Sequence, residues 1–423
     1  MTSPTTFAAG ALRGTIRVTG DKSISHRALM LGGVASGSTS ITGLNRGADV
    51  AATLRAMRAL GINVDDRAGT IVVRGGSMHS PSEVLDCANS GTTSRLLLGL
   101  CTGFGLEARF DGDASLRSRP MERIARPLRA IGAVVETSAG TLPARVIGIP
   151  PPPGGAFELE LPSAQIKSAI LFAHLRARGP LTITGDAFSR DHSERMLRYL
   201  GADIDWDGRT IVLRSAGLRG APIDVPGDLS AAAFFMVAAA TTPGGDITIE
   251  HVGLNPSRDG ILDALRAMGA ALDIGATTRS AGEDVAAIRV RHSRLHAIDL
   301  EEAVALRAID EIPALAVAAA YAEGTTRIRK MADLRNKESD RIATTAAMLR
   351  AAGIAVDEYP DGFDVHGGRP TPPEQPIQTH HDHRIAMSAA ALAAGMGTVT
   401  IDGDEAIAVS FPEFRSVWQS ARA

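Results

Sequence analysis

The chain has 423 residues, of which 44% are hydrophobic and 22% charged, so it can form two or more globular domains with ample cores. Its 44 basic and 47 acidic residues leave a formal net charge of −3, which gives no electrostatic reason to expect nucleic acid or a membrane as partner. Only four of the 44 basic residues are lysines, and the remaining 40 are arginines. Coding bias toward arginine on exposed surfaces is the simplest explanation. The lysines are Lys22, Lys167, Lys330 and Lys337.

Neither secretion nor membrane insertion is indicated by the sequence. The first residues lack a basic segment followed by an apolar one, so we expect no secretory signal. The longest apolar runs, 231–240 and 312–322, are shorter than the roughly 18 residues that a membrane helix needs. The two cysteines, Cys87 and Cys101, fit neither a disulfide framework nor a zinc signature. We therefore expect a cytoplasmic protein.

One pattern recurs along the chain. Apolar residues at helical spacing end at a glycine, placed as at a helix C-terminus, and strand-like alternation follows. The pattern occupies 54–65, 126–136, 195–205, 262–274 and 346–358. Its glycines, Gly61, Gly132, Gly201, Gly269 and Gly353, are separated by 71, 69, 68 and 84 residues.

A second pattern alternates with the first. An Ala/Leu-rich helix is followed by a glycine and a β-rich stretch, at 37–44, 179–188, 244–254, 324–334 and 397–407. A period of about 70 residues fits close to six times into 423, with the second copy degenerate. Each copy predicts two helices and three or four strands. Six copies suggest two similar α/β domains of three copies each, with a cleft between them.

Polar clusters stand at predicted loop–helix junctions. In the first half of the chain they are 20–27, 89–95 and 163–168, where small, hydroxyl and basic residues precede apolar helices. A helix N-terminus favours an anion, so each junction could bind phosphate or carboxylate. Ordinary helix capping explains the serines and threonines equally well.

The second half carries the densest charge cluster, at 334–341. Lys337 and Arg341 would share a face if this segment were helical, and Glu338 and Arg341 are spaced i, i+3. A solvated, salt-bridged face is the alternative. Asp310 and Glu311 precede an apolar helix, either as dipole caps or as a general acid or base.

The segment 380–384 contains three histidines and an aspartate, which could bind zinc. His380 and His381 are adjacent, and no distant ligand pattern completes a site. We therefore expect no metal.

Together these segments resemble one family, the 5-enolpyruvylshikimate-3-phosphate (EPSP) synthases. The motifs that carry the resemblance are GDKSISHRAL, NSGTTSR, SLRSRPM, LPSAQIKSA, SRDHSERML, DEIPALA, LRNKESDRI and DHRIAMS, in family order over essentially the whole chain. The resemblance implies the inside-out α/β barrel of the enolpyruvyl transferase fold, with six repeated β-α-β-α-β-β units in two domains. It places one domain at 21–226 and the other at 1–20 plus 227–423, with the active site between them.

The resemblance also implies a reaction. The enolpyruvyl group of phosphoenolpyruvate is transferred to the 5-hydroxyl of shikimate 3-phosphate through a tetrahedral ketal, and phosphate leaves. This step belongs to the shikimate pathway of chorismate and aromatic amino acid biosynthesis and needs no cofactor. Phosphoenolpyruvate and shikimate 3-phosphate are thus the expected partners, and we expect a monomer. The family is the target of the herbicide glyphosate.

Site residues follow motif by motif. The resemblance makes Asp310, Glu338 and Lys22 catalytic. Shikimate 3-phosphate would contact Lys22, Ser23, Arg27, Ser163, Ala164, Gln165, Ser189, Arg190, Asp310 and Lys337. Phosphoenolpyruvate would contact Lys22, Gly91, Thr92, Arg119, Gln165, Glu338, Arg341 and Arg384.

Two departures and two alternatives accompany this interpretation. Some members have a lysine shortly before the C-terminal Phe-Pro, where this chain has Ser410, and some have proline where it has Leu96, a position that affects the glyphosate response. One alternative is the sister enzyme acting on UDP-N-acetylglucosamine, which uses a cysteine in a loop that here reads 116–119 without one. The other is a non-catalytic, anion-binding paralogue.

Overall fold

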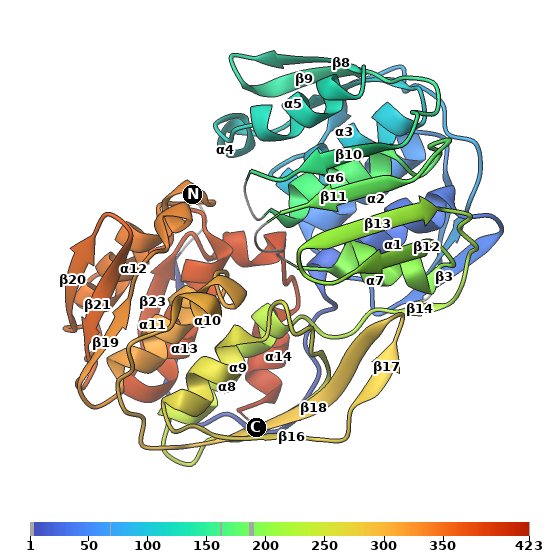
Figure 1. Cartoon of the computed structure of the whole chain (residues 1–423). Helices are drawn as coiled ribbons and strands as arrows, with labels where there is room; N and C mark the ends of the chain where they lie inside the picture. Colours follow the sequence, from blue (N-terminus) through green and yellow to red (C-terminus); the bar gives the residue numbers. More distant parts are fainter. Residues whose placement is uncertain (1–3, 68, 161–162, 186–189, 423) are drawn as a thin grey trace. The chain divides into compact units, whose positions relative to one another are not determined.

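The computed structural model describes residues 4–67, 69–160, 163–185 and 190–422, and these form two compact units (Figure 1). The N-terminal unit consists of Gly20–Val225 and Arg279–Glu283. The C-terminal unit consists of the residues up to Thr19, Pro226–Thr278 and the residues from Asp284 onward. The sequence led us to expect 21–226 and 1–20 plus 227–423. The units differ from that expectation mainly in the short segment Arg279–Glu283.

The sheets of the N-terminal unit have strand orders β14-β3-β5-β4, β6-β7-β9-β8 and β10-β11-β13-β12. In each, the first two strands are parallel and the other pairs antiparallel. The strands are β3 (Ser38–Thr42), β4 (Asn63–Arg67), β5 (Thr70–Arg74), β6 (Leu85–Asp86), β7 (Glu107–Asp111), β8 (Val134–Ser138), β9 (Thr141–Ile147), β10 (Gly155–Glu158), β11 (Leu181–Thr184), β12 (Asp203–Trp206), β13 (Thr210–Ser215) and β14 (Ile223–Asp224).

The core of this unit is built on α1, α3 and α6, whose residues are nearly all buried because apolar side chains surround each helix. Two glycines of α3 let α6 approach closely: a Cβ at Gly99 would lie 2.2 Å from the carbonyl oxygen of Ala169, and one at Gly103 would lie 2.1 Å from that of Ala173. The helices are α1 (Lys22–Val34), α2 (Ala48–Ala59), α3 (Gly91–Gly103), α4 (Ala114–Arg117), α5 (Glu122–Ala130), α6 (Ala164–Ala173) and α7 (His192–Tyr199).

In the C-terminal unit the strand orders are β16-β18-β15-β2, with β17 beside β18, then β19-β21-β20 and β1-β23-β22. The first strands of the chain therefore pair with strands that come much later, β2 with β15 and β1 with β23. The strands are β1 (Thr5–Phe7), β2 (Arg13–Ile16), β15 (Asp246–Gly253), β16 (Ala271–Ile274), β17 (Thr278–Ser280), β18 (Glu283–Arg291), β19 (Thr325–Ile328), β20 (Ala355–Tyr359), β21 (Gly362–His366), β22 (Ile377–Gln378) and β23 (Val399–Asp402).

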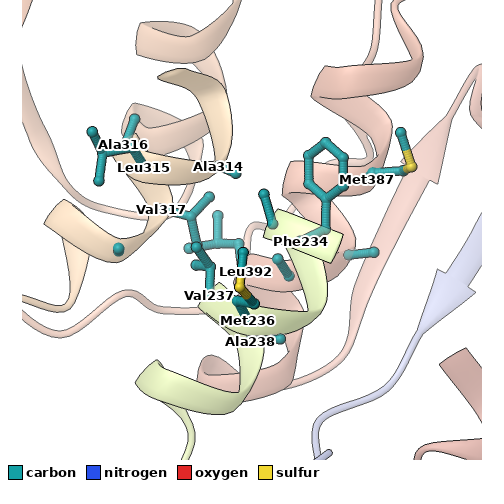
Figure 2. Packing of buried hydrophobic residues seen from close by; sticks show 14 of the residues in the cluster. Phe234, Met236, Val237, Ala238, Ala314, Leu315, Ala316, Val317, Met387 and Leu392 are labelled. Carbon is teal, nitrogen blue, oxygen red and sulfur yellow. The ribbon is translucent and has the colours of Figure 1, made fainter. Parts of the chain in front are cut away.

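Three helices, α8, α11 and α13, form the core of the C-terminal unit. Figure 2 shows Phe234 and Val237 of α8, Val317 of α11 and Leu392 of α13 packed together. The two apolar runs of the sequence lie in and around α8 and α11, and none of the described helices has the length and apolar character to span a membrane. The helices are α8 (Leu229–Thr241), α9 (Gly260–Ala267), α10 (Glu302–Arg307), α11 (Ile312–Ala320), α12 (Arg341–Ala351), α13 (His383–Met396) and α14 (Phe414–Ser420), with 3-10 helices η1 (Ala332–Asn336) and η2 (Asp404–Val409).

The predicted helix–glycine–strand pattern is confirmed at all five places. Each glycine directly follows the C-cap of α2, α5, α7, α9 or α12 and has a φ between 77° and 101°, a left-handed conformation that glycine adopts without strain. The strands β4, β8, β12, β16 and β20 begin two residues later. The expected barrel, by contrast, is not a closed ring of strands, because the sheets of the described residues are open.

Candidate active site

In the C-terminal unit, the candidate residues meet at Arg341, the first residue of α12. Its guanidinium donates to three carboxylates: Nε to Asp382 Oδ2 at 2.8 Å, Nη1 to Asp310 Oδ1 at 3.2 Å and Nη2 to Glu338 Oε2 at 2.5 Å. The Arg341 side chain is 1% exposed. Burial by itself lowers its pKa, but the carboxylates more than offset that effect and raise the pKa above its usual value. Arg341 is therefore a fixed cation in contact with both predicted catalytic acids.

Asp382 orients this cation and also begins α13. Its carboxylate accepts from Arg341, from the Ser339 hydroxyl at 3.0 Å and from the Arg384 backbone N–H at 2.9 Å, which is an N-cap bond. Burial alone raises the pKa of Asp382, but the Arg341 charge outweighs it and the pKa is lowered. The described residues contain no group of three or more His, Cys, Asp or Glu side chains that could hold a metal ion.

Arg384 also contacts Asp310. Its Nη1 donates to the backbone oxygen of Asp310 at 2.9 Å, and its Nη2 lies 3.8 Å from the Asp310 carboxylate. The Asp310 side chain is 16% exposed and that of Glu338 is 21% exposed, so a substrate can reach both acids. The structure thus brings Asp310, Glu338, Arg341 and Arg384 together.

Lys337 behaves differently from the expectation that it shares a helical face with Arg341. The 3-10 helix η1 ends at Asn336, the Lys337 backbone is extended, and α12 starts only at Arg341 because Asp340 caps it. The Lys337 ammonium contacts Asp333 at 2.6 Å. The condition for a shared helical face is therefore not met, because the residues between Lys337 and Arg341 are not helical.

In the N-terminal unit, α1 supplies Lys22, Ser23 and Arg27. Asp21 caps this helix by accepting from the Ile24 N–H at 2.9 Å. Lys22, its first residue, contacts Asp49 Oδ2 at 2.9 Å and keeps 18% of its side chain exposed. The Asp21 cap fixes the start of α1, so Lys22 lies in the first turn of the helix. A half-buried lysine at a helix N-terminus is a suitable contact for an anion.

Arg27 is more deeply held. Its Nε donates to Ser193 Oγ at 2.7 Å, its Nη2 to Ser168 Oγ at 2.9 Å and its Nη1 to the Ser23 backbone oxygen at 2.9 Å. The residue is 3% exposed. Burial, the largest cause, lowers its pKa to about 10, so it stays charged at neutral pH.

Arg119 is held by Asn89, with Nη2 donating to Asn89 Oδ1 at 2.6 Å and to Ser115 Oγ at 3.1 Å. Gly91 begins α3 and stands close to two guanidinium groups: a Cβ there would lie 3.0 Å from Arg95 Nη1 and 3.7 Å from Arg119 Nη1. The absence of a side chain therefore keeps this cationic surface open at the start of a helix.

The start of α6 lies next to that of α3. Gln165 donates to Thr92 Oγ1 at 3.3 Å and accepts from Arg95 Nη1 at 2.5 Å. Ser163 is the N-cap of α6, accepting from the Ile166 N–H at 3.4 Å, and Ala164 is its first residue. The candidate residues Gly91, Thr92, Ser163, Ala164 and Gln165 thus belong to adjoining helix N-termini, and Arg119, just after the end of α4, reaches the start of α3.

Two candidates belong to the segment before α7. Arg190 is half-buried, and its charge lowers the pKa of Arg27, which indicates proximity. Ser189 lies outside the described residues.

The sequence did not single out several residues that complete these contacts. Arg95, Asp382 and Asp49 are buried polar partners of predicted site residues. Arg95 and Asp382 were inside quoted motifs, and the position of Asp382 before an apolar helix signalled only a cap. Asp49 carried no signal, because its partner is 27 positions away in the chain.

Comparison with solved structures shows first which class of protein this fold defines. The chain superposes on the enolpyruvyl transferase NikO of Streptomyces tendae with a TM-score of 0.76 and 20% identity, over 98% of this chain and 96% of that one. That identity is low, so the match establishes the fold alone. The fold is that of the enolpyruvyl transferases.

Closer relatives define the family. EPSP synthase of Acinetobacter baumannii superposes with a TM-score of 0.88 and 41% identity, over 99% of this chain and 98% of that one. The 3-phosphoshikimate 1-carboxyvinyltransferases of Alkalilimnicola ehrlichii and Roseiflexus castenholzii are each 46% identical, covering 96% and 99% of this chain and 92% and 99% of their own lengths. The family model of EPSP synthase (3-phosphoshikimate 1-carboxyvinyltransferase) matches residues 8–418. The chain belongs to the EPSP synthase family and is a transferase.

Proposed function

We propose that this chain transfers the enolpyruvyl group of phosphoenolpyruvate to the 5-hydroxyl of shikimate 3-phosphate and releases phosphate. Membership of the EPSP synthase family supports the reaction. The observation that carries it is the Arg341 cluster, in which one buried cation holds two partly exposed carboxylates, Asp310 and Glu338. Two acids at one cation can serve two proton transfers in the same reaction.

The C-terminal unit supplies the acid–base groups in this proposal. Asp310 accepts the proton of the 5-hydroxyl while the hydroxyl oxygen attacks C2 of phosphoenolpyruvate, and Glu338, in its protonated form, gives its proton to C3. Arg341 and Arg384 bind the anionic groups of phosphoenolpyruvate, because a guanidinium matches carboxylate and phosphate geometry. Lys337 contacts the shikimate side. The tetrahedral intermediate then loses phosphate from C2 and returns a proton from C3 to the Glu338 carboxylate, which restores the double bond.

The N-terminal unit supplies binding groups. Lys22 contacts both substrates, and Arg119 with Gly91, Thr92 and Gln165 binds phosphoenolpyruvate. Fixed cations and backbone N–H groups aimed at developing charge are the main means by which a protein stabilises such transition states. The shikimate 3-phosphate contacts are Lys22, Ser23, Arg27, Ser163, Ala164, Gln165, Ser189 and Arg190.

Four finer features belong to the same proposal. The two units are the two domains, and the six sheets derive from six copies of one β-α-β-α-β-β unit, as the recurring glycines suggest. The protein acts as a monomer in the cytoplasm.

Phosphate release from phosphoenolpyruvate tests the function. We expect release with shikimate 3-phosphate as acceptor and none with UDP-N-acetylglucosamine. Release with the aminosugar alone would establish the sister activity, and no release with either would establish the non-catalytic alternative. Burial raises the pKa of both cysteine thiols, Cys87 and Cys101, which makes them unsuited to the cysteine chemistry of the sister enzyme.

Variants test the two roles separately. Asp310→Asn and Glu338→Gln should each lower turnover by about 10²- to 10⁴-fold with unchanged circular dichroism. Asp299→Asn and Glu302→Gln are matched controls, because both residues form exposed ion pairs, and they should retain wild-type rates. Wild-type rates in either site variant would contradict its assignment.

A further inference from the structure

The N-terminal unit buries an ion pair that the proposed roles leave unused. Lys167 of α6 contacts Glu194 of α7, with Nζ 2.7 Å from Oε1, and the side chains are 1% and 0% exposed. Removing two charges from water costs free energy. A pair of apolar side chains of similar size often stabilises a protein at least as much as a buried ion pair does. Stability therefore does not account for the pair by itself.

The chain neighbours of this pair hold Arg27. Ser168 follows Lys167, and Ser193 precedes Glu194, and both hydroxyls accept from the Arg27 guanidinium at 2.9 and 2.7 Å. The two hydroxyl oxygens lie 2.6 Å apart, so they also hydrogen-bond to each other. The ion pair thus joins α6 to α7 directly beside the two acceptors of Arg27.

Electrostatics connect the pair to the same guanidinium. Burial lowers the pKa of Arg27, and among the charges that raise it again Glu194 acts most strongly. The Glu194 carboxylate therefore attracts Arg27 as well as Lys167. With the Lys167 ammonium in contact, Glu194 has a cationic partner, and Arg27 keeps its bonds to the serines.

We propose that Lys167 and Glu194 are positioning residues for the binding of shikimate 3-phosphate. Lys167 neutralises Glu194, so that Arg27 keeps its hydrogen bonds to Ser168 and Ser193 and stays available to the substrate anion. Without Lys167, Glu194 competes with the substrate for Arg27. The inference rests on the proposed function, because it assigns Arg27 to shikimate 3-phosphate.

The first test is Lys167→Met in the full chain, which removes the ammonium and keeps most of the side-chain volume. We expect binding of shikimate 3-phosphate, measured by calorimetry, to weaken by about tenfold or more. The KM for shikimate 3-phosphate should rise in parallel, while the KM for phosphoenolpyruvate stays within about twofold of wild type. A purely structural role would lower the melting temperature without this split between substrates.

A double variant tests the compensation itself. Lys167→Met combined with Glu194→Gln removes both charges, so Arg27 has no competing carboxylate. We expect the affinity of this double variant for shikimate 3-phosphate to return to within about threefold of that of the wild type. This comparison also holds if the single variant fails to fold, because no charge is left buried without a partner in the double variant.

Lys330→Met is the matched control, since Lys330 contacts Glu302 at the same 2.7 Å but on the surface. It should bind shikimate 3-phosphate as wild type does. Unchanged affinity in a folded Lys167→Met variant, or a double variant weakened about tenfold or more, would overturn the proposal. A wild-type protein that does not bind shikimate 3-phosphate would instead contradict the proposed function.

Discussion

Asp382→Asn is the most informative single substitution for the C-terminal unit. The change removes the negative charge next to Arg341 while keeping the size and the helix-capping ability of the side chain, because asparagine caps helices about as well as aspartate. Three hydrogen bonds then lose their charged acceptor: those donated by Arg341 Nε at 2.8 Å, by Arg341 Nη2 at 3.3 Å and by the Ser339 hydroxyl at 3.0 Å.

The size of the effect follows from the burial of the pair. Breaking a buried ion pair costs about 3–5 kcal/mol. Arg341 retains Glu338 and Asp310 as partners, so we expect the lower end, a loss of about 3 kcal/mol. In a unit of roughly 200 residues, that loss lowers the melting temperature by about 6–12 °C.

The loss should also depend on pH. The folded-state pKa of Asp382 is below its usual value, so its contribution is present above the unfolded pKa of about 3.9 and is lost as the pH falls through the folded value. Wild type and Asp382→Asn should therefore differ by a constant amount between about pH 5 and 8, and converge below about pH 4.

Urea denaturation followed by circular dichroism measures this difference. Asp299→Asn is the control, because Asp299 contacts Arg327 at the same 2.8 Å but is 74% exposed, and we expect it to cost at most about 1 kcal/mol. A loss in Asp382→Asn no larger than that of the control would refute the reasoning. So would a difference that persists unchanged as the pH falls below about 3.

Three further predictions concern other parts of the molecule. Arg384→Lys should raise the KM for phosphoenolpyruvate by about tenfold, because a bidentate guanidinium is replaced by an ammonium that acts as a point charge. An unchanged KM in steady-state kinetics would contradict the contact between Arg384 and phosphoenolpyruvate. Gly99→Ala should lower the unfolding free energy by about 1–3 kcal/mol, because the new Cβ would lie 2.2 Å from a backbone oxygen. Gly76→Ala is the control and should cost far less, because a Cβ there has no atom within 4 Å. Equal melting temperatures of the two variants would contradict this prediction. Neither Cys87 nor Cys101 should react with a thiol reagent at pH 8 until the protein is unfolded, since burial raises both pKa values, that of Cys101 to about 12; rapid labelling of the native protein would show the opposite.

The local structure was predictable because it depends on residues close together in the chain. Glycines such as Gly61 and Gly201 end helices through their own backbone freedom, and their positions could be read from the spacing of apolar residues. The polar clusters were also found, because helix N-termini require polar residues there. The spacing of Lys337 and Arg341 could not show whether the segment between them is helical, and in the structure α12 starts only at Arg341.

The partners of the site residues were not predictable. Asp382 reaches Arg341 across 41 positions, and Lys167 meets Glu194 across 27, which no periodicity encodes. Such pairs depend on how separate helices pack against one another, so they can be identified only in the folded chain. Lys167 illustrates this: in the sequence it is only one of four lysines, and the structure shows Glu194 as its partner.

The pairing of the first strands has a consequence for synthesis on the ribosome. Strand β1 leaves the ribosome long before its partner β23, with which it pairs Thr5 opposite Ile401, and β2 likewise precedes its partner β15. Translation at about 5–20 residues per second means that β1 waits about 20–80 s for its partner. The N-terminal unit has nearly all of its chain available long before then and should fold first. Strands β1 and β2 of the nascent chain thus remain without these sheet partners until β23 and β15 have been made, which leaves them open to a chaperone or to mispairing.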